Sequence, residues 1–573
     1  MRLRMNLHQF VYNLHFDVES VRAADVKVDW DDAPLPFKIY SGTEQLTLPQ
    51  AWPGIANQSG FARPSQPGIF DDLGTLLWYS YGLTAIAQTY VPVQDNESAI
   101  DLVQTLRRFA PSGGGLYPSE LYVYLNMDED KRGVYHYDVE RHTLSLLRTG
   151  DFDNYLQQAL GGRVDFSNVT VALFVSTMFW KNFFKYHDFS YRLQGIDAGA
   201  VVGQVISSAQ RLNFRSIVQF QFLDAAINHL LGLSEETETV YAVISLVHKS
   251  DGTALTRQKP QSPPVSATGL YKLLARVNPS YYIKSRRIKA YPNIVDLNRA
   301  AMYHSTEDFY PSDAEPARFE LEKADSPSAQ MECNPGQQAP AQGKQVQQVK
   351  LPSEPGLNYD FYRACKQRYS PGADFWFGQV SINDVATLLH EATSTVDYHS
   401  DITAHGDAGM AEGIREVAAS RFVMGVCLHG VSGIEDGAYV YDRSSRTLHL
   451  CNEGDYRVRL QQGMSMHNVN LHQVPLCFHI LGDVHHLKRQ YGYRGHRIQH
   501  MEAGIVLQKL LLTASALGMN GHPLLDYDEA LCDEIYNSSA INKTTLIQIP
   551  VGYYRPVARL EASLCLQHSV KRP

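Results

Sequence analysis

Two segments in the first half of the chain combine residue types that could bind a ligand and move protons. In RRFAPSGGGLYPSELYVYL, Pro111 and Ser112 precede three glycines that begin with Gly113 and Gly114. Glycines let the backbone approach a ligand closely, and free N–H groups beside a hydroxyl can cradle a phosphate or a flavin. A simple turn ahead of the strand ELYVYL would give the same glycine run, because such runs are common in turns.

The second segment is KYHDFSYRLQGIDAGAVVGQVISSAQRL, in which Lys185 and Tyr186 precede a long apolar helical pattern. A lysine beside a tyrosine can transfer protons when burial favours the neutral amine. A solvated lysine and a packing tyrosine are the alternative interpretation.

Two segments of the second half could bind an anion. YRACKQRYSPG contains Arg368 and Ser370, and IPVGYYRPVAR contains Gly552 and Arg555 after an apolar run. An arginine fork binds phosphate through two hydrogen bonds, and a serine can bond a hydroxyl of the same ligand. A surface loop and a surface arginine at a chain end would explain both segments equally well.

The chain contains an internal repeat. GVYHYDVERHTLSLL (133–147) matches GAYVYDRSSRTLHLC (437–451), and DAGAVVGQVISSAQRLNF (197–214) matches EAGIVLQKLLLTASALGM (502–519). DLGTLL pairs with DVATLL, and TVYAVISLV pairs with TTLIQIPVG, in the same order in both halves. Each half therefore predicts a helix, a strand pair, a long apolar helix and a last strand, which is an α+β pattern.

The length of 573 residues requires more than one domain. We expect an N-terminal extension at 1–45, one domain at 46–300, a linker rich in Pro and Gln at 301–357, and a second domain at 358–573. Two copies of one fold in a chain suggest a pair packed about a pseudo-twofold axis.

Composition excludes several classes of protein. A net charge of −9 gives no basic field for nucleic acid, and 44% hydrophobic residues with 19% charged residues are typical of a globular protein. No apolar run of spanning length and no secretory signal is visible, so we expect a cytoplasmic protein without membrane contact. The seven cysteines form no C-x-x-C pair, and the adjacent His485 and His486 are expected in a loop or on the surface, so no metal site is predicted.

Taken together and in this order, these segments resemble the nitroreductase superfamily. The most similar branch is the SagB/McbC-like azoline dehydrogenases, also called thiazole/oxazole oxidases. PSGGGLYPSELYVY, KYHDFSYR and the D-A-G helix carry the resemblance in the first half. YSPGADFWFG, YGYRGHRIQHMEAG and ALGMNGHPLLDYDEAL carry it in the second.

The resemblance implies two tandem FMN-dependent nitroreductase-like domains packed as a pseudo-dimer, with FMN bound between subunits. It assigns phosphate contacts to Arg368, Ser370 and Arg555. The full set of expected flavin contacts adds the Pro-Ser loop and the loop near flavin N5, and is Pro111, Ser112, Gly113, Gly114, Arg368, Ser370, Gly521, His522 and Arg555. It assigns catalysis to Lys185 and Tyr186.

The two halves depart from the family pattern in complementary ways. The last strand of the first half lacks the Gly and Arg of the second copy. The second half has AHGDAGMAEG where the first has APSGGGLYP, and its YGYRGHR contains no Lys-Tyr pair. One competent and one degenerate flavin site is therefore expected.

The resemblance implies oxidation of a thiazoline or oxazoline in a peptide to an azole. Related members oxidise carrier-bound aminoacyl groups or use NAD(P)H as a reductant, and fold alone does not choose among them. The expected partners are a peptide or carrier-bound small substrate, and a cyclodehydratase or another synthase. A flavin-free scaffold subunit of a peptide-modifying synthase is the alternative from another class.

Overall fold

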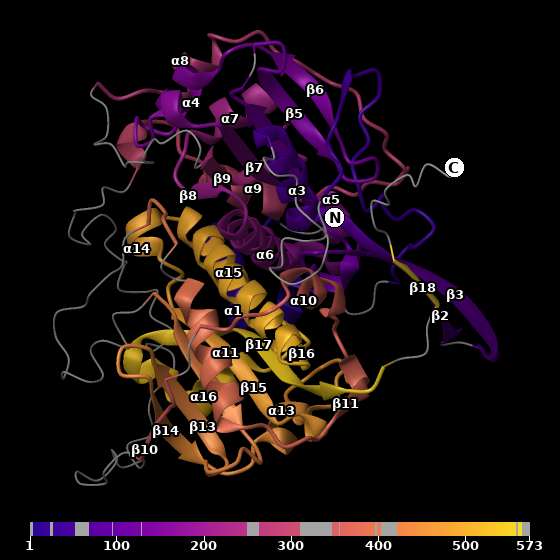
Figure 1. The fold of residues 1–573 in the computed structure, drawn as a ribbon, viewed down its shortest axis with the longest axis vertical. Coiled ribbons are helices and arrows are strands. Elements are labelled where there is room, and N and C mark those ends of the chain that lie inside the picture. Colours follow the sequence, from indigo (N-terminus) through magenta and orange to yellow (C-terminus); the bar gives the residue numbers. More distant parts are fainter. Residues whose placement is uncertain are drawn as a thin grey trace.

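The computed structural model contains two sheet-and-helix halves joined through a central pair of helices (Figure 1). It describes residues 4–22, 27–51, 68–93, 96–127, 129–248, 263–309, 347–353, 356–395, 398–402, 421–556 and 560–563. Within these residues, every helix is too short or too polar to cross a lipid bilayer.

The first half folds around an antiparallel sheet with strand order β1-β6-β5-β4-β7-β9-β8. Helices α3 and α6 pack on one face of this sheet, and α4 and α7 pack on the other. Because both faces are covered, the central strands are almost wholly apolar and aromatic, as a strand buried on both sides requires. The elements are β1 (Gln45–Thr47), α3 (Ile69–Tyr81), β4 (Ser119–Leu125), β5 (Gly133–Asp138), β6 (Thr143–Thr149), α4 (Asp153–Ala159), β7 (Val171–Met178), α5 (Trp180–Tyr186), α6 (Ser190–Arg211), β8 (Phe214–Gln219), α7 (Asp224–Leu231) and β9 (Glu238–His248).

The second half repeats this arrangement. Its sheet has the order β10-β14-β13-β12-β15-β17-β11, and β16 also pairs with β17. Helices α11 and α15 cover one face, and α13 and α16 cover the other. The elements are β10 (Gln348–Lys350), α10 (Phe361–Gln367), β11 (Phe375–Trp376), α11 (Ile382–Ser394), β12 (Val423–Leu428), β13 (Gly437–Asp442), β14 (Thr447–Glu453), α13 (Arg457–Gln462), β15 (Leu476–Asp483), α14 (Lys488–Tyr491), α15 (Arg494–Ala516), β16 (Asn520–Gly521), α16 (Glu529–Tyr536) and β17 (Lys543–Tyr554).

The repeated sequence segments occupy equivalent places in the two sheets. GVYHYD forms β5 and GAYVYD forms β13, each paired with the following strand. DLGTLL lies in α3 and DVATLL in α11, while the D-A-G and E-A-G segments lie in α6 and α15. The mixed arrangement of helix and sheet expected from the sequence is thus confirmed.

Helices α6 and α15 pack against each other at the centre of the molecule because their glycines allow the backbones to touch (Figure 1). A Cβ added at Gly199 would overlap the carbonyl oxygen of Met501, and one added at Gly504 would overlap that of Ile196. The glycine that follows each acidic residue and alanine in the repeat is therefore the contact point of the two helices. Such close backbone approach requires the missing side chain of glycine.

Two ion pairs cross between the halves in a reciprocal manner. Arg192 of α6 pairs with Glu529 at the start of α16, with 2.6 Å between Nη1 and Oε1. Arg497 of α15 pairs with Asp224 at the start of α7, with 2.9 Å between Nη2 and Oδ1. Asp224 receives a second arginine, Arg494, at 2.6 Å. Each long helix thus reaches the same element of the other half, which is the relation that a twofold axis produces.

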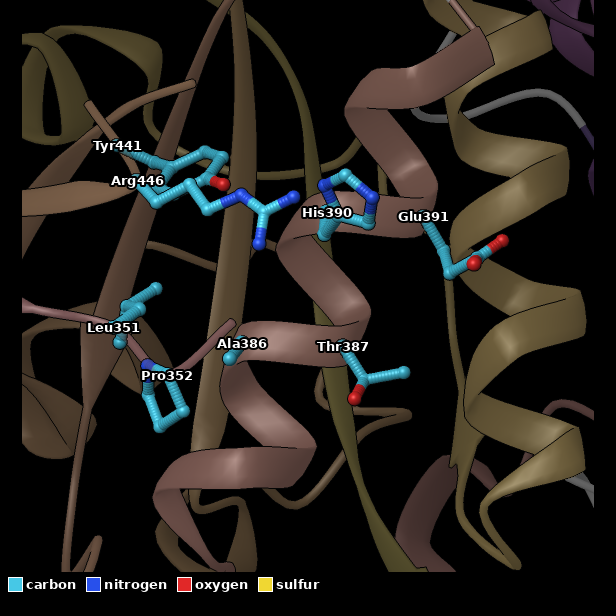
Figure 2. A pocket seen from close by; sticks show the side chains of 8 residues that line it. All are labelled: Leu351, Pro352, Ala386, Thr387, His390, Glu391, Tyr441 and Arg446. Carbon is cyan, nitrogen blue, oxygen red and sulfur yellow. The ribbon is translucent and has the colours of Figure 1, made fainter. Parts of the chain in front are cut away.

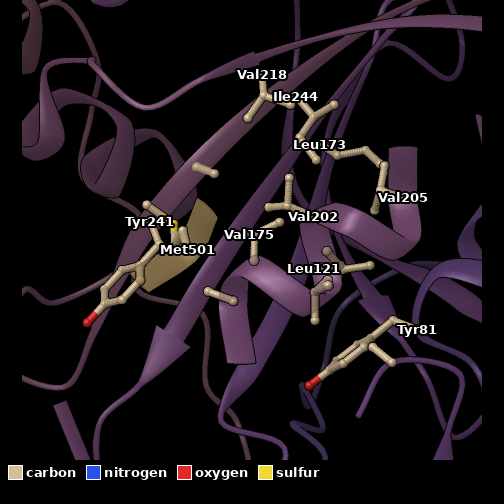
Figure 3. Close-up of a cluster of buried hydrophobic side chains, with 14 of the residues drawn as sticks. Tyr81, Leu121, Leu173, Val175, Val202, Val205, Val218, Tyr241, Ile244 and Met501 are labelled. Carbon is tan, nitrogen blue, oxygen red and sulfur yellow. The ribbon is translucent and has the colours of Figure 1, made fainter. Parts of the chain in front are cut away.

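The core of the first half includes a side chain from the second half. Figure 3 shows Met501 of α15 beside the strand and helix residues of this cluster, including Tyr241 and Val202. Met501 is fully buried, as are its neighbours Tyr241 and Val202. The two halves therefore share apolar packing and are not separate globules.

A third, smaller sheet also joins the halves. It has the order β18-β2-β3, formed by β18 (Leu560–Ser563), β2 (Leu83–Val93) and β3 (Asn96–Arg108). A strand from the end of the chain is added to a hairpin of the first half, and this hairpin extends away from the body in Figure 1.

Segments outside the two expected domains also have defined places. The extension at 1–45 contains α1 (Leu7–Phe16) and α2 (Val18–Val21), and α1 packs against α6 and α16 of different halves. The range expected as a linker, 301–357, contains β10, which pairs with β14, and residues 310–346 lie outside the described part. Helices α8 (Ala267–Tyr271) and α9 (Pro292–Ala300) complete the first half.

Four histidines gather in the interior near α15. The sequence predicts His486 in a loop or on the surface. His486 does lie in a loop, but its side chain is buried, with 3% exposed. Its ring centroid is 5.1 Å from that of His15, 5.0 Å from that of His496 and 5.6 Å from that of His500. The surface placement is therefore wrong for His486, because α1 of the extension covers it.

Candidate functional site

The glycine loop lies between β3 and β4 and is held by a carboxylate of α6. Ser112 Oγ donates to Asp197 Oδ2 at 2.6 Å, and the backbone N–H of Gly113 donates to Asp197 Oδ1 at 3.0 Å. Gly114 has a φ of +65°, which an L side chain rarely adopts. Burial raises the pKa of the Asp197 carboxyl to about 7, against the two hydrogen bonds that favour its ionised form.

Lys185 and Tyr186 lie beside this loop at the end of α5. A Cβ added at Gly114 would lie 3.1 Å from Lys185 Nζ and would overlap Tyr186 Oη. Lys185 Nζ is 4.8 Å from the centroid of the Tyr186 ring, and both side chains are half-buried. The structure therefore brings the expected pair together with the expected glycine loop, and glycine is required where they meet.

The residue after this pair has an unusual backbone conformation. His187 has φ 52° and ψ −141°, a combination that is almost confined to glycine. In the second half, Gly492 follows Tyr491 with φ 56° and ψ −144°. The two turns are equivalent, and only the first half places a side chain in this strained position.

The second-half residues expected to bind the cofactor also lie together. Gly372 N–H donates to Nδ1 of His522 at 3.0 Å, so the segment after Ser370 reaches the residue next to Gly521. The backbone N–H of Arg555 donates to the carbonyl of Asp374 at 2.9 Å. Burial lowers the pKa of His522 to about 4, so this imidazole is neutral at physiological pH and can accept the Gly372 hydrogen bond.

Arg368 joins the two groups across the halves. Its Nη2 donates to the carbonyl of Arg108 at 3.3 Å, three residues before Pro111, and Arg107 donates to the carbonyl of Arg368. Only 6% of Arg368 is exposed. Among the described residues its Nε has no hydrogen-bond partner, and no carboxylate pairs with its guanidinium.

The electrostatics of this junction are unfavourable for the protein alone. Burial, and then the positive charge of Arg107, lower the pKa of Arg368 to about 10. Arg107 itself pairs with Glu561 of β18 at 3.0 Å. A buried cation beside another cation is costly unless an anion is present, so this junction is suited to a phosphate or a carboxylate.

Not every expected contact is free to serve a ligand. The Ser112 hydroxyl and the Gly113 N–H, expected as ligand donors, are both directed to Asp197. Arg555 is exposed and is placed near the site by its backbone. The segment AHGDAGMAEG, which the second half has in place of the glycine loop, lies outside the described residues, as do Arg63 and Ser65, which form an R-x-S in the first half.

Two hollows lie elsewhere in the described part. The pocket in Figure 2 is formed by α11, β10 and the β13–β14 turn, and its volume of about 10 Å³ accommodates a single water molecule. A cavity of about 310 Å³ lies between α7 and the segment 271–281, with Lys38 and Glu238 in its wall. These two side chains pair with each other at 2.7 Å.

Comparisons with known proteins agree with the fold. Residues 86–246 match the Nitroreductase family model. This range contains the glycine loop, Lys185, Tyr186 and Asp197. No curated protein matches the sequence.

Solved structures extend the likeness to both halves. A protein of Anabaena variabilis, described as a nitroreductase, is 19% identical and has a TM-score of 0.68 over 96% of this chain and 100% of its own. The fold of the whole chain is therefore of nitroreductase type. The Escherichia coli microcin synthetase McbBCD complex with truncated pro-MccB17 bound is 19% identical over 33% of this chain and 78% of that chain, with a TM-score of 0.25. A nitroreductase of Exiguobacterium sibiricum in complex with FMN is 13% identical over 38% of this chain and 96% of its own, with a TM-score of 0.22.

The sequence interpretation missed several residues that shape this site. Asp197 begins the repeated D-A-G segment, and Arg107 and Arg108 precede the glycine loop, so all three lay within segments already singled out. Their partners are distant in sequence, and spacing alone does not reveal such pairs. Arg192 and Arg497 occupy the same place in the two repeats, five residues before Asp197 and Glu502, and this shared position was a usable signal.

Proposed function

We propose that this protein is an FMN-dependent oxidoreductase with one flavin bound between its two halves. The observation that carries the proposal is Arg368, a buried guanidinium without a carboxylate partner among the described residues, at the junction with the glycine loop. A phosphate would supply the missing negative charge. The tandem halves would then act as a fused pseudo-dimer, held together by the reciprocal arginine pairs.

The residues present fit FMN. Arg368 Nε is buried and unbonded among the described residues, and the half-buried Ser370 lies two residues away, where a ribityl hydroxyl would follow the phosphate. His522 and Gly521 lie beside this segment and would contact the ring. On the other side, the loop that begins at Pro111 would cover the flavin with backbone, and the Ser112 hydroxyl would contribute through Asp197, which fixes the loop.

FMN bound here would accept a hydride, while the protein supplies orientation and proton handling. We propose that Lys185 Nζ takes the proton that leaves the substrate, and that Tyr186 Oη, which lies at the same glycine, orients the amine or passes the proton on. Loss of one hydride and one proton would convert a thiazoline or oxazoline ring in a peptide to the aromatic azole. A peptide with such rings, delivered by a cyclodehydratase or another synthase, is the proposed substrate.

A matched pair of arginine variants tests the cofactor site. Arg368→Ala should weaken FMN binding by about 1.5–3 kcal/mol, roughly ten- to a hundredfold in Kd, because it removes a charge-assisted contact. Arg363→Ala, which changes an exposed residue in the first turn of the helix that ends just before Arg368, should leave the Kd unchanged. Fluorescence titration of the flavin-free protein with FMN measures both.

The cofactor content and the reaction are tested separately. We expect the purified protein to be yellow and to release one FMN per chain on heating. A colourless protein that binds no added FMN would instead support the scaffold subunit. Mass spectrometry of azoline peptides after incubation should show the loss of two hydrogens, and two flavins per chain would contradict the single composite site.

A further inference from the structure

Residues 29–32 of the N-terminal extension lie against the proposed proton-transfer pair. The indole of Trp30 is 5.5 Å from Lys185 Nζ and packs edge-on against Phe184, with 5.5 Å between the ring centroids. Yet 55% of Trp30 is exposed, which is unusual for the largest apolar side chain. Part of Trp30 therefore lies beside Lys185 and Phe184, and the rest of its surface is in solvent.

A second segment, residues 282–289, is fixed beside Trp30. Asp32 accepts hydrogen bonds from the backbone N–H groups of Arg286 at 2.7 Å and Arg287 at 2.8 Å. Ser285 Oγ donates to the carbonyl of Asp32 at 2.8 Å and accepts from Trp180 of α5 at 2.9 Å. The two segments are thus tied to each other and to the helix that carries Lys185.

The second segment presents apolar and basic side chains to solvent. Exposure is 60% for Tyr282, 54% for Ile283 and 49% for Ile288. Three basic side chains alternate with them and are exposed, and within the described ranges none of the three has an ion-pair partner. We call this surface the rim; it consists of Trp30, Tyr282, Ile283, Lys284, Arg286, Ile288 and Lys289.

We infer that the rim docks a partner polypeptide segment in which apolar side chains alternate with carboxylates, and that docking places the reactive group of this segment at Lys185. The inference rests on the proposed function, because it identifies the rim as the entry to that site. It also gives the N-terminal extension a role, since Trp30 belongs to it.

Two properties of the rim favour an acidic, apolar polypeptide over other partners. Four large apolar side chains that are about half exposed lie along the two paired segments, and such patches mark interaction sites. The basic side chains beside them form a local positive charge on a chain whose net charge is −9. They would therefore attract a segment that carries carboxylates to this part of the surface.

A peptide selection tests the inference without knowledge of the natural substrate. The full-length, flavin-loaded protein is immobilised and screened with a random peptide library on phage, and enriched peptides are synthesised with a fluorophore. We expect enrichment of Asp and Glu next to Phe, Leu and Trp. Fluorescence anisotropy should show that the selected peptides bind the triple variant Lys284→Glu/Arg286→Glu/Lys289→Glu with a Kd about tenfold higher or more. Their affinity for the parent should fall as NaCl is raised from about 50 to 500 mM.

The control carries the same change of charge elsewhere. Lys350→Glu/Arg459→Glu/Arg489→Glu alters exposed side chains of the second half and should bind the peptides as the parent does. Equal binding by both triple variants, enrichment without carboxylates, or tighter binding of RNA than of any peptide would overturn the inference. FMN content should stay at the parent level in both variants. A parent protein that binds no FMN would count against the proposed function and not against the rim.

Discussion

Acid should destabilise this protein steeply, and the buried histidines near α15 set the expected size of the effect. Burial lowers the pKa of His500 to about 3, and the positive charge of the buried Arg192 adds to the shift. Burial also lowers the pKa values of His15, His486 and His496 well below their usual range. All four rings pack within 6 Å of another member of the group.

The sign and magnitude follow from linkage. An unfolded histidine takes up a proton near pH 6.5, while His500 in the folded protein resists protonation down to about pH 3. The stability that its neutral form contributes is therefore full above pH 6.5 and is lost as the pH falls below this value. Between pH 7.5 and 5, one such histidine costs about 2 kcal/mol, which is a large part of the total stability of many domains.

Replacement of one ring isolates the contribution. His500→Gln keeps a polar side chain that cannot be charged, so the slope of unfolding free energy against pH below 6.5 should decrease by about 1.4 kcal/mol per pH unit, equivalent to one proton. Guanidinium unfolding followed by tryptophan fluorescence at several pH values gives this slope. His467→Gln, at an exposed position, is the control and should leave the slope as in the parent. Equal slopes in His500→Gln and the parent would refute the reasoning, because His500 would then titrate alike in both states.

Three further outcomes are expected from single substitutions. Lys185→Ala and Tyr186→Phe should keep the flavin and lose about 10²–10⁴-fold in turnover of a confirmed azoline peptide; unchanged turnover would remove the residue from the mechanism. Gly199→Leu should separate α6 from α15 and prevent stable folding, seen as a loss of soluble protein, whereas Gly115→Ala, in open space but with a positive φ, should cost only about 1 kcal/mol in the unfolding free energy. His187→Gly should relieve backbone strain and raise the unfolding free energy by about 1 kcal/mol, measured by chemical denaturation; a destabilised variant would show that the His187 side chain contributes more than the strain costs.

Much of the fold could be predicted from the sequence, because each repeated segment has a short-range pattern of its own. GVYHYD and GAYVYD alternate in a manner that predicts strands, and both became β5 and β13 in equivalent sheets. The long apolar helices were also predictable, since their period spans many residues. The short edge strand β10 could not be predicted, because three residues in a polar stretch give no periodic signal. This strand depends on its partner β14.

The candidate site was predictable in its parts and less so in its connections. Arg368 was identified by motif, but its burial against Arg108 depends on how the halves pack, which no local pattern encodes. Likewise, Ser112 and Gly113 were recognised as donors, while their acceptor, Asp197, is separated from them by more than eighty residues. Trp30 belongs to the expected extension at 1–45, for which the sequence predicts no chemistry, because its contact with Lys185 arises only when that extension packs beside α5.

The two halves explain together why one site should be competent. Their equivalent turns place Tyr491 where Tyr186 stands, and Gln490 where Lys185 stands, so the second half keeps the turn and the phenol but has no amine. At the following equivalent position, Glu502 does not hold a glycine loop in the described part; it accepts from Tyr398 at 3.3 Å and pairs with Arg421 at 3.0 Å. Helix packing needs the turn and the glycines in both halves, because α6 and α15 touch backbone to backbone. It needs neither the amine nor a carboxylate that holds a glycine loop, so a symmetric scaffold is compatible with chemistry on one side only.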